Sequence, residues 1–180
     1  MKRMILMILC AIIFTGCTAN KANSNSLSDF EDLFTFEYSG EVSEKREKET
    51  AQFGEETMYS SQKTMGKAGN ISFVIEYLDA DVLTMVEYNG SDMASMKDMV
   101  NQRYSFFTDY KFEDVTISGN SQGFIVSFGD PVDVNERKMF LYAKNPKVDE
   151  YAVITLSYKK GDMDEAQAWM DHAVETFTWK

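Results

Sequence analysis

One stretch of the sequence, Gly119-Asn120-Ser121-Gln122-Gly123, has the G-x-S-x-G spacing of a nucleophile elbow, the turn that presents a catalytic serine. Aspartates and then His172 follow it, which gives the order Ser, Asp, His. An elbow joins a strand to a helix, whereas residues 124–128 alternate as a further strand. Because a hairpin turn explains both glycines, we expect no catalysis at Ser121 and keep a hydrolase only as the alternative.

Three acidic clusters could supply oxygen ligands to calcium. They are Asp79 with Asp81, Asp130 with Asp133 and Glu136, and Asp162 with Asp164 and Glu165. None has the twelve-residue order of an EF-hand, with its central glycine and terminal glutamate. Turns and helix starts favour these residues without a metal, so we predict no metal site and leave a weak calcium-binding module as a second alternative.

The N-terminus has the features of an export signal. Lys2 and Arg3 precede an apolar run, residues 4–14, that is too short to cross a bilayer as a helix and suits the h-region of a signal peptide. The run ends in Phe14-Thr15-Gly16-Cys17, which resembles the lipobox of bacterial lipoproteins. That resemblance implies that residues 1–16 are a signal peptide and that Cys17 receives diacylglycerol and palmitate-type acyl chains.

A lipid on Cys17 would hold the mature chain on the extracytoplasmic side of the cell membrane. Two or more acyl chains anchor a protein stably. The polar residues 18–28 then read as a flexible tether with a reach of about 18 Å, so residues 17–28 are the lipidated cysteine and its tether. Residues 29–180 have the size of one domain with a single core.

Charge and cysteine usage exclude several classes of function. Without the signal, 16 of the 18 basic residues face all 29 acidic ones, a formal net charge of −13, which argues against a nucleic-acid partner. Cys10 leaves with the signal and Cys17 carries the lipid, so no thiol remains for a disulfide or a nucleophile. His172 is the only histidine, which excludes zinc sites with several histidines, and we expect no cofactor.

Hydrophobic periodicity predicts strands, then a helix, then a strand meander, then a final helix. Strands are expected at residues 34–38, 58–62 and 70–78, with 82–88 as an extension or partner strand, and the charged residues 41–49 are expected to be a solvated loop or hairpin end. Four further strands are expected at residues 112–118, 123–128, 137–143 and 151–159. Their short connections leave no room for crossover helices, so the meander should be antiparallel.

Two amphipathic helices are predicted. The first starts at Ser91 or Asp92 and runs to about residue 108, with an apolar stripe of Met93, Met96, Val100, Tyr104 and Phe107 that leaves Met99 outside it. The second closes the chain. Its expected capping box is Asp162 with Glu165, and its stripe is Ala166, Trp169, Met170, Ala173, Val174 and Phe177.

This element order, with its strand-to-helix ending over residues 151–179, resembles the PsbP-like family over residues 30–180. The family is named for an extrinsic subunit of photosystem II, and it includes bacterial lipoproteins and a eukaryotic Ran-release factor. The resemblance implies an α+β fold, an antiparallel sheet with two main helices packed on it as an α/β/α sandwich. It also implies an accessory or binding module rather than an enzyme.

We therefore expect a lipid-anchored extracytoplasmic module that binds another envelope protein or a small envelope ligand. The alternative is a hydrolase that acts on envelope material.

Overall fold

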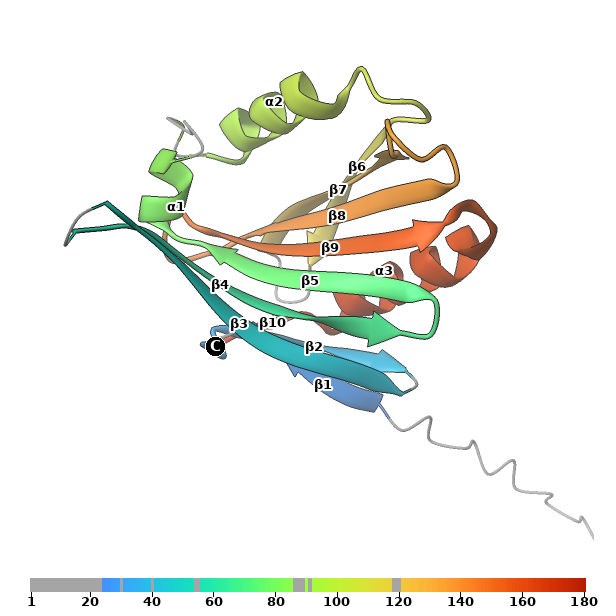
Figure 1. Cartoon of the computed structure of the whole chain (residues 1–180), viewed down its shortest axis with the longest axis horizontal. Helices are drawn as coiled ribbons and strands as arrows, with labels where there is room; N and C mark the ends of the chain where they lie inside the picture. Colours follow the sequence, from blue (N-terminus) through green and yellow to red (C-terminus); the bar gives the residue numbers. More distant parts are fainter. Residues whose placement is uncertain are drawn as a thin grey trace, which may run out of the picture.

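The computed structural model describes residues 24–29, 31–39, 41–53, 56–85, 90, 92–117 and 121–180. The predicted signal peptide and Cys17 lie outside these residues. Figure 1 shows a large twisted sheet with helices on both faces and a small second sheet below it. The predicted α+β class is confirmed.

Within the part of the chain that the structure describes, the large sheet contains seven strands, all paired antiparallel. In spatial order they are β3 (Val42–Phe53), β4 (Glu56–Ala68), β5 (Ile71–Leu78), β9 (Tyr151–Lys159), β8 (Glu136–Lys144), β7 (Ser121–Gly129) and β6 (Lys111–Ile117). The last four strands form the predicted meander, and β5 pairs with β9 to close it onto the N-terminal hairpin.

The two faces of the sheet bury separate apolar cores, because successive side chains of a strand point to opposite faces. Helix α2 (Met93–Tyr104) and the short α1 (Ala80–Met85) lie over one face, and α3 (Met163–Thr176) lies under the other (Figure 1). On β7, for example, Ile125 belongs to the core on the α3 side, whereas Phe124 and Val126 belong to the core on the α2 side. The predicted sandwich of helix, sheet and helix is therefore confirmed.

The small sheet completes the core on the α3 side. It consists of β1 (Ser24–Ser28), β2 (Phe34–Ser39) and β10 (Thr178–Trp179), in the order β1, β2, β10. Phe34 stacks on Phe177 with ring centroids 4.9 Å apart, and Phe36 meets Trp169 edge-on at 5.4 Å. These contacts join the first strands to the last helix, which the sequence pattern alone does not show.

Both predicted helices form with their predicted stripes inward, but α2 ends at Tyr104 rather than near residue 108, so Phe107 lies beyond the helix. Asp92 caps α2, since its side chain accepts a hydrogen bond from the Ser95 N–H, and Met93, Met96 and Val100 are buried. The four residues of α3 that are buried are Ala166, Trp169, Met170 and Ala173. Met99, which lies outside the predicted stripe, is half-buried and packs against the core on the α2 side.

Three local predictions are wrong. Residues 42–49 lie in β3, where a charged strand is tolerated because β3 is an outer strand whose side chains at residues 43–46 are exposed. Residues 80–85 form helix α1, which Asp79 starts by accepting a hydrogen bond from the Val82 N–H at 2.8 Å. Asp162 makes no side-chain cap; it ends a 3₁₀ turn (Lys160–Asp162) before α3.

The predicted tether is shorter than expected. Its last five residues, Ser24–Ser28, pair with β2 as strand β1, because Leu27 is an apolar side chain that the small sheet buries completely. The preceding residues, 18–23, lie outside the described residues.

Candidate functional site

The described residues of the predicted elbow do not have the surroundings of a hydrolase nucleophile; residues 119 and 120 lie outside the described residues. Ser121 is the first residue of β7, pairs with Ile117 of β6, and is buried. His172 lies in α3, and its backbone carbonyl accepts a hydrogen bond from Thr176. Both residues are described, and no hydrogen bond joins them. Ser121 thus lies in a strand–hairpin–strand setting, which does not present a serine as an elbow does.

The carboxylates of the cluster formed by Asp130, Asp133 and Glu136 already have hydrogen-bond or ion-pair partners nearby. Oδ1 of Asp130 accepts from the Val132 N–H at 2.8 Å and the Asp133 N–H at 3.2 Å, and these bonds lower the pKa of Asp130. Asp133 and Glu136 both contact the Lys159 ammonium. Within the described ranges, no group of three or more His, Cys, Asp or Glu side chains is arranged to hold a metal ion.

The described carboxylates of the other two clusters likewise do not converge on one point. Asp79 caps α1, whereas the side chain of Asp81 lies outside the described residues. Asp162 accepts a hydrogen bond from Asn70 at 3.4 Å, and Asp164 and Glu165 are exposed in the first turn of α3. Considering the described residues only, no helix is long and apolar enough to cross a membrane.

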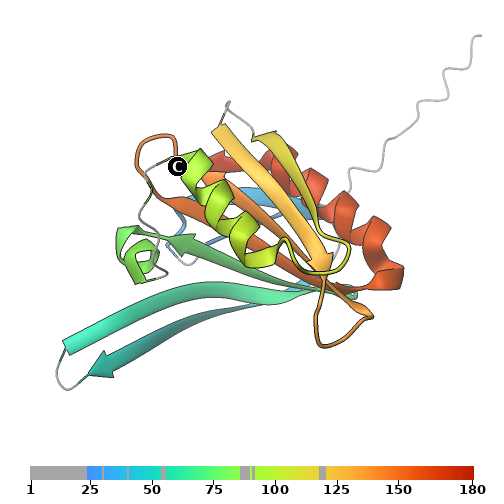
Figure 2. The same cartoon turned by 90° about the horizontal axis from the view of Figure 1, so that it is seen from above.

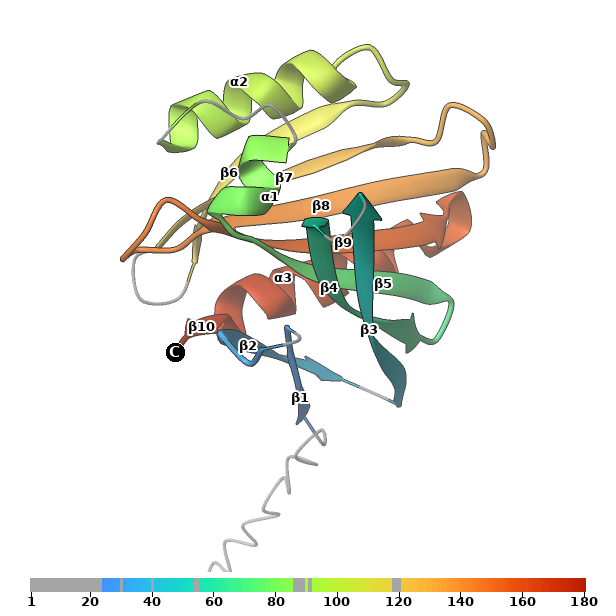
Figure 3. The same ribbon diagram turned by 60° about the vertical axis from the view of Figure 1, so that its left-hand side comes forward.

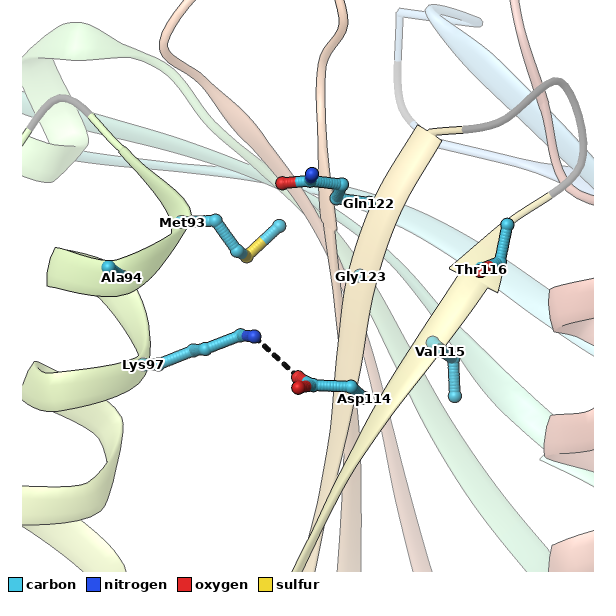
Figure 4. Close-up of a pocket in the computed structure, with 8 residues that line it drawn as sticks. All are labelled: Met93, Ala94, Lys97, Asp114, Val115, Thr116, Gln122 and Gly123. Atoms are coloured by element: carbon cyan, nitrogen blue, oxygen red, sulfur yellow. Dashed lines mark ion pairs between the residues drawn. The ribbon is translucent and has the colours of Figure 1, made fainter.

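A pocket of about 420 Å³ opens between the start of α2 and the outer strands β6 and β7 (Figure 4). We call it the α2 pocket. Its lining residues are Met93, Ala94, Lys97, Asp114, Val115, Thr116, Gln122 and Gly123. β6 is the last strand of the sheet formed by the described residues, so one side of the pocket adjoins a strand edge.

An ion pair spans the α2 pocket. Nζ of Lys97 on α2 lies 2.5 Å from Oδ1 of Asp114 on β6 (Figure 4). The same ammonium lies 5.9 Å from the ring centroid of Phe112. Thr116 and Gln122, both exposed and directly paired across β6 and β7, add a hydroxyl and an amide. The pocket therefore offers a cation, an anion and two neutral hydrogen-bonding groups to a polar ligand.

The α2 pocket brings together residues that the sequence pattern did not single out as a site. Lys97 lies outside the predicted apolar stripe of α2, and Gln122 belongs to the segment predicted to be a hairpin turn. Asp114 and Thr116 occupy alternate positions of β6, and Lys97 lies one helical turn after Met93, so each set shares a face. Their approach depends on how α2 crosses the sheet, for which the local sequence carries no signal.

A second pocket, of about 400 Å³, lies at the opposite end of the meander. Asp109, Lys111, Arg137, Tyr158 and Met163 are among its lining residues. Burial raises the pKa of the Tyr158 hydroxyl, so this group stays a neutral hydrogen-bond donor at physiological pH. Arg137 is almost fully buried and already has protein partners.

No protein-family model matches the chain, and no curated protein matches it either. Solved structures that are similar in fold include the following two. The cyanobacterial PsbP protein (CyanoP) of Synechocystis sp. PCC 6803 is 14% identical with a TM-score of 0.41, over 91% of this chain and 96% of that chain. The Ran-binding protein Mog1p of Saccharomyces cerevisiae is 10% identical with a TM-score of 0.48, over 88% of this chain and 96% of that chain. Such likeness concerns the fold alone.

Proposed function

We propose that the chain is a lipid-anchored, extracytoplasmic module that works by binding, and that the α2 pocket receives a polar group of an envelope component. The anchor follows from the lipobox-like Phe14-Thr15-Gly16-Cys17 after a charged and apolar leader. Its location follows from the anchor, since a signal of this kind sends the mature chain across the membrane.

The observation that carries the binding role is the convergence of polar groups in the α2 pocket. Lys97, Asp114 and Gln122 come from three different elements and meet at one open concavity beside the buried Met93. Ligand sites typically combine an apolar wall with a few convergent polar groups. Because Lys97 and Asp114 are both charged, a ligand that hydrogen-bonds to either group can replace part of the ion pair.

The partly exposed ion pair suits reversible binding. The Lys97 side chain is 28% exposed and that of Asp114 is 66% exposed, so water already screens their attraction. Separating them to admit a ligand therefore costs little. A chain with a net charge of −13 after removal of the signal would also repel strongly acidic partners at long range.

Photo-crosslinking in the membranes of the source cell tests the proposal. A benzophenone amino acid at Gln122, on the rim of the α2 pocket, should give a discrete adduct that Lys97→Met abolishes. The matched control carries the probe at Glu175, an exposed residue of α3 on the other face of the sheet. The same adducts from Gln122 and Glu175, or adducts unaffected by Lys97→Met, would contradict binding in the α2 pocket.

A further inference from the structure

Exposed apolar side chains gather at one end of the sheet. Among the described residues, five large hydrophobic side chains are exposed; three of them lie in two loops at this end, and a fourth is the first residue of α3 there. They are Phe106 (73% exposed), Val132 (93%), Val134 (76%) and Met163 (46%). We call these four residues the apolar loop end. The fifth, Val148, lies between β8 and β9 at the other end of the sheet.

Backbone hydrogen bonds hold the two loops and the turn before α3 side by side. The Gly129 N–H donates to the carbonyl of Thr108 at 2.7 Å, which joins the end of β7 to the segment after α2. The Lys160 N–H donates to the carbonyl of Asn135 at 2.8 Å, which joins the β7–β8 loop to the turn before α3. Figure 1 shows these loops together at its right-hand side.

Val132 and Val134 are exposed in a turn that side-chain-to-backbone hydrogen bonds stabilise. Asp130 accepts hydrogen bonds from the backbone of Val132 and Asp133, and Asp133 accepts one from the Asn135 N–H at 2.9 Å. Single exposed apolar residues are ordinary, whereas several at one end of a molecule make that end a candidate for contact with a protein or a membrane.

The described chain begins at this same end of the molecule. Ser24 pairs with Ser39, which lies three residues before Val42, and Val42 pairs with Ala68. The turn after Ala68 contains Asn70, whose side chain donates to Asp162, the neighbour of Met163. Figure 1 shows β1 under the right-hand side of the molecule, where β9 leads into α3, and Figure 2 shows the start of α3 at the same right-hand side.

The sequence fixes how far this end can be from Cys17. Seven residue steps separate Cys17 from Ser24. Fully extended, they reach about 25 Å, and as a flexible coil about 15 Å. A lipid on Cys17 would therefore keep the N-terminal end of the sheet close to the membrane surface.

We propose that the apolar loop end rests on the lipid surface in which Cys17 is anchored, with Val132, Val134, Phe106 and Met163 in its interfacial layer. This inference rests on the lipid anchor of the proposed function. Acidic and basic groups are mixed in the same loops, as in the contacts of Asp133 and Glu136 with Lys159. Apolar contact rather than charge therefore drives the association, which should depend little on anionic lipid.

This orientation would present the α2 pocket away from the membrane. Thr116 and Gln122 form the second-last pair of the β6–β7 ladder, whose other end leads to Gly129 and the apolar loop end. Figure 3 shows α2 beside the same ladder, on the face opposite to α3. A membrane-resting loop end would thus leave the pocket open to envelope proteins.

Site-directed spin labelling of the full-length lipidated protein tests the orientation. With Cys10 removed in the signal and Cys17 blocked by lipid, Val132→Cys provides a single labelling site. In vesicles of phosphatidylcholine, with or without phosphatidylglycerol, the label at residue 132 should be at least fivefold less accessible to a water-soluble nickel chelate than a label at Val148→Cys. Val134→Asp should restore access at residue 132.

The outcomes are distinguishable. Equal access at residues 132 and 148 in a protein whose intact mass shows lipidated Cys17 overturns the orientation and leaves the anchor in place. An unmodified Cys17 overturns both. Protection of residue 132 in native membranes but not in pure-lipid vesicles overturns the lipid contact in favour of a protein partner at the apolar loop end.

Discussion

Arg137 is held by Asp109 at the base of the apolar loop end. Nη2 of Arg137 lies 3.0 Å from Oδ2 of Asp109, while Nη1 donates to the carbonyls of Val134 at 2.9 Å and Glu136 at 3.0 Å. The arginine side chain is 10% exposed, whereas the aspartate side chain is 64% exposed. The guanidinium therefore ties two loops together, mostly through fixed backbone carbonyls.

The two partners should contribute unequally to stability. Arg137→Met removes three hydrogen bonds that a buried cation donates and should lower the free energy of unfolding by about 1–3 kcal/mol. Asp109→Asn keeps an acceptor at an exposed site and should cost less than about 1 kcal/mol. Urea denaturation of both variants measures the difference. Equal losses would mean that the exposed ion pair, rather than the carbonyl contacts, holds the loops.

Asp29 should make stability depend on pH in a specific direction. Burial raises its pKa above the ordinary value, although the backbone N–H groups of Phe34 and Glu31 donate to it and act in the opposite sense. A carboxyl whose folded-state pKa is raised binds its proton more tightly in the folded state. Its contribution to the free energy of unfolding therefore increases as pH falls from neutral through the raised pKa.

Two substitutions separate charge from hydrogen bonding at this site. Asp29→Asn should remove this component of the pH profile and leave stability at pH 7 equal or higher, because Asn can still accept from the Phe34 N–H. Asp29→Ala should lower the free energy of unfolding at pH 7 by about 1–3 kcal/mol, because the buried Phe34 N–H would lose its acceptor. Thermal unfolding between pH 4 and 7 provides the comparison. If the wild type and Asp29→Asn showed the same dependence of stability on pH, this would contradict a raised pKa of Asp29.

Gly66 should be intolerant of any side chain. A Cβ there would lie 1.9 Å from the carbonyl oxygen of Ser43 on β3, and 2.8 Å from the ring of Phe73. Gly66→Ala must therefore push the β3–β4 pairing apart, at a cost of about 1–3 kcal/mol or more. Gly161→Ala is the matched control, since nothing lies within 4 Å of its added methyl. Similar melting temperatures for the two variants would contradict this packing.

Elements with strong periodicity were predictable from sequence. The meander strands alternate and are separated by turn residues, and the stripe of α3 repeats every three or four residues, so local pattern and tertiary packing agree there. Residues 80–85 and β3 were not predictable. A two-turn helix is too short for periodicity, and β3 is a charged outer strand whose pairing with β4, rather than burial, keeps it extended.

The small sheet and the candidate sites depend on long-range contacts. Phe34 meets Phe177 across nearly the whole chain, and Lys97 meets Asp114 only because α2 crosses the β6–β7 edge. The apolar loop end combines Phe106, Val132 and Met163, which no short sequence window contains. Such groupings follow from topology, which local propensity does not encode.

The fold should tolerate substitutions in the α2 pocket that weaken ligand binding. Lys97→Met and Asp114→Asn remove partly exposed charges, so each should change the free energy of unfolding by less than about 1 kcal/mol. Each should nevertheless weaken ligand binding by roughly tenfold or more, because a hydrogen bond to a charged group is lost. The yield of crosslinks from Gln122, compared with the melting temperature, checks the separation. If the crosslink yield and the melting temperature fell together, the ion pair would have a structural role instead.

The most direct measurement is membrane fractionation of the wild type and Cys17→Ser, with the intact mass of the mature protein determined in parallel. We predict that the mature wild-type chain begins at Cys17, carries acyl chains and partitions into detergent. Cys17→Ser should stay unprocessed or leave the membrane fraction. A mature chain without lipid, or unchanged detergent partitioning of Cys17→Ser, would contradict the lipid anchor and the proposed function that depends on it.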